Sequence, residues 1–148
     1  GDGPLRGELE SLVRELEVKD RVIFLGARSH EEVAGIMRGH HVLLVPSVTD
    51  AQGGMEGIPV AIMEAMATGL LVVASDHSGI PEIVRQGENG LLADERDDAG
   101  LANALAEIYS DHDEWDRLVG AARDTVHQEY NLQVQNRRLA DLLADLSS

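Results

Sequence analysis

Residues 59–75 have the sequence PVAIMEAMATGLLVVAS, in which a helix pattern passes directly into a strand pattern. Pro59 suits the first turn of a helix that we predict to run to about Thr68, and Gly69 suits its end. Residues 70–74 form a continuous apolar run, which predicts a buried strand. A helix that leads at once into such a strand is typical of a parallel sheet covered by helices.

The same alternation continues on both sides of this stretch. Further apolar runs predict strands at 22–25, 42–45 and 91–93. Helices are predicted at 6–18, at 29–39 after a capping box, at 80–85, and in three segments that begin at Asp97, at Asp113 or Asp116, and at Asn131. We therefore predict four parallel strands with helices on both faces, which is an open α/β fold of the Rossmann-like type. The length of 148 residues suits one domain, 1–148.

The composition excludes several classes of function. Lys and Arg number 12 against 27 Asp and Glu, and the net charge of −15 argues against binding nucleic acid or an anionic membrane. Cys is absent, which excludes disulfides, thiolate metal sites and Cys nucleophiles. The six His residues lack metal-ligand spacing, so we expect no metal site. We also expect no cofactor. The longest apolar stretch, 60–74, is interrupted by Glu64, and we predict no insertion into a membrane.

Ligands of open parallel sheets bind beyond the carboxyl ends of the strands. The loop from Ser47 to Pro59 lies at that edge and is long for its kind, and long ordered loops there are usually functional. Free amides at a helix start form an anion site. Pro59 has no N–H, so Gly57 and Ile58 are the candidate donors.

Two carboxylates accompany this predicted anion site. Glu56, just before the helix, either complements the helix dipole or binds something other than an anion, such as sugar hydroxyls. Glu64 lies inside an apolar helix, so we predict that it is buried, and a buried carboxylate needs a partner. That partner is either a diol, whose two hydroxyls a carboxylate can accept, or a structural Arg. The residues alone leave both alternatives open.

Several motifs follow one another along the chain: MEGIPV at 55–60, MEAMA at 63–67, HSGIPE at 77–82 and GENGL at 87–91. In this order and spacing they resemble the retaining group 1 glycosyltransferases, a family with the GT-B fold. The mark of that family is a Glu, seven residues and a second Glu, here Glu56 and Glu64. The stretches MEGIPV at 55–60 and HSGIPE at 77–82 look most like its colanic-acid and exopolysaccharide branch. The resemblance runs through nearly the whole chain and also includes residues 1–5, 63–67, 69 and 87–91.

The resemblance implies a role for each motif. Glu56 is the expected catalytic residue and faces the hydroxyls of the donor sugar. Glu64 is expected to accept hydrogen bonds from the ribose hydroxyls of the nucleotide. The Arg28 side chain is expected to cover the face of the base. The residues expected to bind substrate through backbone or side chain are Gly57, Ile58, Pro59, Glu64, Gly26, Ala27, Arg28 and Ser47. No bound metal is implied.

The resemblance also implies a longer protein. A GT-B enzyme has two Rossmann-like domains, and its acceptor domain comes first. We expect 1–148 to be a C-terminal nucleotide-sugar-binding domain that lacks its first strands, is inactive alone, and binds a nucleotide diphosphate sugar. A sugar or lipid-linked acceptor would bind through the missing domain. The expected process is polysaccharide or glycoconjugate synthesis in the cytoplasm. Whether the full-length enzyme also binds at the inner face of the membrane is left open. The alternative is a non-catalytic nucleotide-sugar-binding or assembly module.

Overall fold

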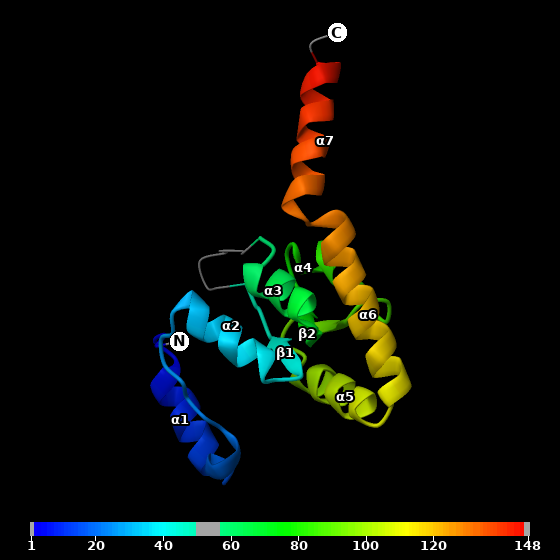
Figure 1. The fold of residues 1–148 in the computed structure, drawn as a ribbon. Coiled ribbons are helices and arrows are strands. Elements are labelled where there is room, and N and C mark those ends of the chain that lie inside the picture. The colour runs from blue at the N-terminus through cyan, green and yellow to red at the C-terminus, as the bar shows by residue number, and fades with distance from the viewer. Residues whose placement is uncertain (1, 50–56, 147–148) are drawn as a thin grey trace. The chain divides into compact units, whose positions relative to one another are not determined.

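The computed structural model describes residues 2–49 and 57–146 (Figure 1). The chain forms two compact units, Gly1–Ile36 and Met37–Ser148.

The first unit contains α1 (Arg6–Glu15), a short 3-10 turn (Lys19–Arg21) and the beginning of α2 (His30–Arg38). The predicted capping box before α2 is confirmed. Ser29 Oγ accepts from the Glu32 N–H at 3.3 Å, and a Glu32 carboxylate oxygen accepts from the Ser29 N–H at 2.9 Å. Reciprocal bonds of this kind satisfy amides that the first helical turn leaves without partners.

The predicted strand at 22–25 is not formed. A strand needs a hydrogen-bonded neighbour, and no described residue pairs with this segment. Ile23 is 81% exposed, whereas Phe24 lies under the Arg6 guanidinium, 5.7 Å from it. The apolar run is therefore held by contacts with α1 and not by a sheet.

The second unit is built on a parallel sheet of β1 (Val42–Val45), β2 (Leu71–Asp76) and β3 (Leu91–Asp94), in that order. The prediction of an open parallel sheet is confirmed, and the described residues form three of its strands where four were predicted. Residue pairs Val42↔Leu71 and Val73↔Leu91 set the register. All carboxyl ends consequently lie at one edge of the sheet and all amino ends at the other.

The sheet packs against helices α3 (Val60–Thr68), α4 (Ile80–Ile83), α5 (Asp98–Tyr109) and α6 (His112–Glu129). Helix α7 (Leu132–Asp145) instead contacts α6, and none of its residues is buried. Leu71 and Val73 pack against α5 and α6 in one buried cluster, whereas the alternate residues of β2 point to the other face, where α3 packs. None of the described helices is long and apolar enough to cross a membrane.

The predicted helix ends are partly correct. Gly69, at φ +92°, ends α3, and this left-handed conformation favours glycine. Asp97 and Asn131 cap α5 and α7 as predicted. The start of α6 was wrongly placed at Asp113 or Asp116, because the side chain that accepts from a first-turn amide belongs to Asp111.

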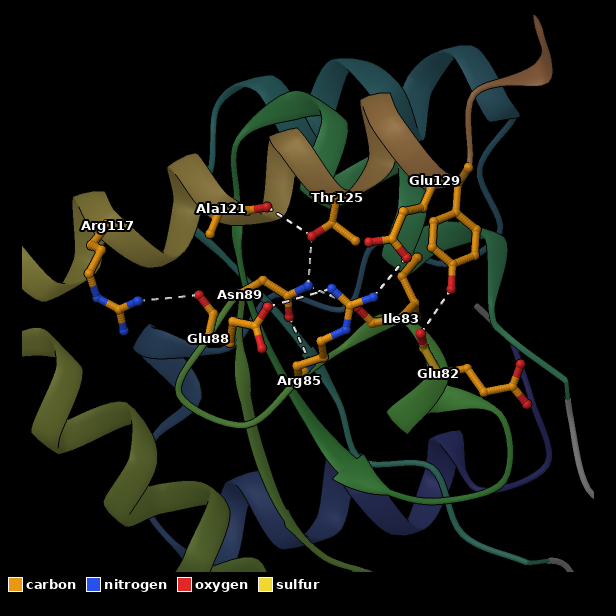
Figure 2. Close-up of polar contacts among 10 residues, drawn as sticks. Glu82, Ile83, Arg85, Glu88, Asn89, Arg117, Ala121, Thr125 and Glu129 are labelled. Carbon is orange, nitrogen blue, oxygen red and sulfur yellow. Dashed lines mark hydrogen bonds and ion pairs between the residues drawn. The ribbon is translucent and has the colours of Figure 1, made fainter. Parts of the chain in front are cut away.

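Helix α6 is joined by hydrogen bonds to the backbone at the amino edge of the sheet. Arg123 donates to the Thr68 carbonyl at 3.1 Å, just before β2, and Arg117 donates to the Gly87 carbonyl at 2.6 Å, just before β3. Figure 2 shows Asn89 at the centre of the contacts near β3. It is 1% exposed and donates to the Ile83 carbonyl and to Thr125 Oγ1, both at 3.0 Å.

The remaining contacts of this network join both backbone and side-chain groups. The Asn89 side-chain oxygen accepts from the Arg85 N–H at 2.7 Å. The Arg85 guanidinium donates to Glu129 at 2.7 Å, and the Tyr130 hydroxyl donates to the Glu82 carbonyl at 2.9 Å (Figure 2). The Gly-Glu-Asn-Gly stretch at 87–90 therefore has a structural role, at the edge opposite the predicted site.

Candidate functional site

The candidate site lies at the carboxyl edge of the sheet. Residues 46–49 follow β1, residues 77–79 follow β2 and residues 95–97 follow β3. Since the three strands are parallel, these segments share one edge, which is where such sheets bind ligands. Glu56, the predicted catalytic residue, falls outside the described residues. Ser47 is half-buried in the first of the three segments.

The predicted amide donors stand at the start of α3. Pro59 is the N-cap residue, with extended backbone, and it is directly preceded by Gly57 and Ile58. Gly79, from the segment after β2, packs against them so closely that an added Cβ would lie 3.2 Å from the Ile58 nitrogen. The structure therefore brings the segment after β2 against the helix start that the sequence indicates as an anion site.

Glu64 is half-buried, so the prediction of full burial is wrong. The buried stripe of α3 consists of Ile62, Ala65 and Met66. Glu64 lies on the flank of that stripe, and Val60 is 61% exposed, so the helix has an outer face despite its apolar sequence. This half-buried carboxylate lies on the helix that follows the predicted amide donors, and part of it is exposed to solvent.

The predicted base-binding residues belong to the first unit. Gly26 has φ +73°, and the Ala27 N–H donates to Asp2 at 2.9 Å. The Arg28 guanidinium is exposed and pairs with Glu32 at 3.2 Å. Nucleobase contact by these residues stays a prediction.

A polar cluster that the sequence did not predict joins the three edge segments. We call Thr49, His77, Glu95 and Arg96 the Glu95 cluster. Glu95 accepts from the Thr49 N–H at 2.9 Å and from the Thr49 hydroxyl at 3.2 Å. His77 Nδ1 lies 3.0 Å from Glu95 Oε2, and Arg96 donates to the Thr49 carbonyl at 3.2 Å. The only sequence signal is that His77 and Glu95 each directly follow a strand.

The electrostatics of this cluster fix the direction of its bonds. The Thr49 N–H and, next, the His77 ring lower the pKa of Glu95 to about 2, from an ordinary value of 4.5. The carboxylate is ionised at neutral pH and can only accept, so His77 donates to it from Nδ1. His77 is 5% exposed, and its ring orientation is set by this bond.

The donor set at this edge combines backbone amides with carboxylates. Across residues 2–49 and 57–146, no group of three or more His, Asp or Glu side chains is arranged to hold a metal ion. The edge offers backbone amides at the start of α3, which bind anions, and carboxylates, which accept from hydroxyls.

Solved structures share this fold. Sucrose-phosphate synthase from Thermosynechococcus elongatus is 32% identical and superposes with a TM-score of 0.82 over 99% of this chain and 35% of its own. HepE from Anabaena, in complex with UDP, is 27% identical with a TM-score of 0.82, over 94% of this chain and 36% of its own. HepE in complex with UDP-glucose superposes equally well, with a TM-score of 0.82.

Sequence comparison agrees with the structural one. A putative colanic acid biosynthesis glycosyltransferase, WcaL from Salmonella typhimurium, is 43% identical over 97% of this chain. The chain spans 36% of the length of that relative. The profile of the family "Glycosyl transferases group 1" matches residues 1–125. The motifs and the parallel fold of this chain agree with that match. We conclude that the chain belongs to the group 1 glycosyl transferases.

Proposed function

We propose that the chain is the donor-binding portion of a retaining glycosyltransferase. The reaction moves a sugar from a nucleotide diphosphate sugar to an acceptor hydroxyl, in the synthesis of a polysaccharide or glycoconjugate. The observation that carries the proposal is the start of α3, where Gly57 and Ile58 precede the helix and Glu64 lies on its accessible flank. HepE, which has the same fold, was solved with UDP and with UDP-glucose.

The spacing along α3 fits this ligand. Glu64 lies four residues after Val60, the first residue of α3, which corresponds to about 6 Å of helix rise. A nucleoside diphosphate extends over a comparable length between its phosphates and its ribose. The amides at Gly57 and Ile58 would bind the phosphates, and the Glu64 carboxylate would accept from the ribose hydroxyls.

The other expected residues complete the proposed site. Glu56 would face the donor sugar, and Ser47 and Pro59 would border it. Gly26 and Arg28 would contact the base. Ala27 would take part through its carbonyl, because its N–H already donates to Asp2. Protein groups would offset the charge of the leaving diphosphate, so no metal is needed. The acceptor would bind through a further domain of a longer protein. We place that longer protein in the cytoplasm.

The test is the affinity of the 148-residue chain for UDP-, GDP- and ADP-sugars, screened by thermal shift and measured by calorimetry. Glu64→Ala removes a charge-assisted acceptor and should weaken binding by roughly 1.5–3 kcal/mol. Glu107→Ala, at an exposed position of α5, is the matched control and should change nothing. A folded Glu64→Ala variant with unchanged nucleotide affinity would refute the role of Glu64.

A further inference from the structure

We propose that Glu95 is a positioning residue of the donor site, which fixes both ends of the connection between β1 and α3. The two ends are Thr49 and the pair Gly57–Ile58. This inference rests on the proposed function for its consequence on binding, but the contacts that carry it are independent of any ligand.

The first end is held at the backbone of Thr49. Glu95 Oε1 accepts from the Thr49 N–H at 2.9 Å, and Glu95 Oε2 accepts from its hydroxyl at 3.2 Å. The next side chain, Arg96, donates to the Thr49 carbonyl at 3.2 Å. Glu95 and Arg96 thus bind the backbone N–H and the backbone carbonyl of Thr49. These two contacts fix the orientation of Thr49 at the edge of the sheet.

The second end is held through His77. Glu95 Oε2 accepts from His77 Nδ1 at 3.0 Å, and the imidazole is buried. Two residues later, Gly79 lies directly against Gly57 and Ile58. The His77 ring therefore sets the path of the segment that supports the predicted amide donors, and Glu95 sets the His77 ring.

The backbone on both sides of these contacts is strained. Ser78 has φ +49° and Arg96 has φ +67°, which place non-glycine residues in the left-handed region. Ser78 directly follows His77, and Arg96 directly follows Glu95. Conformations of this kind persist where surrounding contacts over-determine them, and they are concentrated at functional sites.

Glu95 lies outside the hydrophobic core. Its side chain is 29% exposed, and the buried core cluster is formed by apolar residues of β2, α5 and α6. We therefore expect loss of its charge to change the geometry of the sheet edge more than the stability of the fold. This difference separates a positioning role from a general structural one.

The experiment compares the wild-type chain with Glu95→Gln by calorimetry, with UDP-glucose and GDP-mannose as probes. Glutamine keeps the size and one acceptor oxygen but cannot accept from both the Thr49 N–H and His77 Nδ1 as the carboxylate does. We expect the affinity to fall about tenfold, equivalent to ~1.4 kcal/mol. Glu95 pairs with Arg96 at 3.4 Å. Glu114→Gln is the matched control, because Glu114 pairs in the same way with Arg117, but on α6. Its affinity should equal that of the wild type.

A second measurement does not need a ligand. In NMR spectra of Glu95→Gln, the Thr49 and Ile58 amides should shift and the His77 ring nitrogens should report a changed tautomer, whereas Glu114→Gln leaves all three unchanged. Unshifted Ile58 and His77 signals in folded Glu95→Gln would overturn the inference. If Glu95→Gln does not fold, Glu95→Asp, which keeps the charge with a shorter reach, takes its place with the same expected shifts.

The two proposals fail in different ways. A wild-type chain that binds no nucleotide or nucleotide sugar contradicts the proposed function, and the NMR comparison then still decides the role of Glu95. A wild-type chain that binds these probes, with Glu95→Gln and Glu95→Asp equally tight, contradicts the positioning role alone.

Discussion

Replacing Asn89 by Ala tests whether the 87–90 stretch is structural. Asn89 is 1% exposed and makes three hydrogen bonds, to the Arg85 N–H, the Ile83 carbonyl and Thr125 Oγ1. Each such bond contributes about 1 kcal/mol net. Their loss should destabilise the chain by ~3 kcal/mol, because the Arg85 amide and the Ile83 carbonyl also lose a buried partner.

The assay is thermal unfolding, followed by calorimetry or circular dichroism. For a unit of this size, a loss of ~3 kcal/mol lowers the melting temperature by roughly 10 °C. Thr125→Ser, which keeps the hydroxyl, is the control and should lower it far less. A melting temperature of Asn89→Ala within about 2 °C of the wild type would refute the estimate. Loss of nucleotide affinity below the melting range would refute the structural assignment, since the network lies at the edge opposite the site.

Two further predictions concern the site. Glu56→Gln should leave the affinity for free UDP nearly unchanged but abolish transfer in a longer protein that supplies the acceptor domain; equal losses for UDP and UDP-glucose would place Glu56 elsewhere. The pKa of Glu95 is held at about 2 by Thr49, His77 and Arg96. Its contribution to stability should therefore be complete above pH 4.5 and disappear as the pH falls from there toward about 2. The difference in melting temperature between wild type and Glu95→Gln should shrink over that window, and a constant difference would contradict this assignment.

The elements that the sequence predicts well are those that depend on local pattern. The stretch 59–75 forms α3 and β2 as expected, because an apolar run and Gly69 act within a few residues. The run at 22–25 is also apolar, but no strand among the described residues lies beside it. A pattern within one segment cannot show whether a partner strand exists. The full burial of Glu64 was wrongly predicted. When nearly every residue of a helix is apolar, the sequence does not indicate which side of the helix faces solvent.

The candidate site likewise contains one part that local sequence predicts and one part that it does not. The helix start after Gly57, Ile58 and Pro59 could be predicted from these residues themselves, whereas their contact with a ligand stays a prediction. The Glu95 cluster was not found, because its bonds join residues 46 and 18 positions apart in the chain. Such pairs become neighbours only once the order of the strands is known. Until then a Glu after a strand cannot be distinguished from any other exposed carboxylate.

The left-handed backbone of Arg96 has a consequence for engineering. Replacing Arg96 by Gly would relieve about 1 kcal/mol of backbone strain and would remove the exposed hydrogen bond to the Thr49 carbonyl, which contributes a similar amount. The two effects nearly cancel, so a screen for thermostability would accept the substitution as neutral. Selection on melting temperature alone would thus erode one half of the contact that orients Thr49, and libraries at this edge need a binding readout alongside the thermal one.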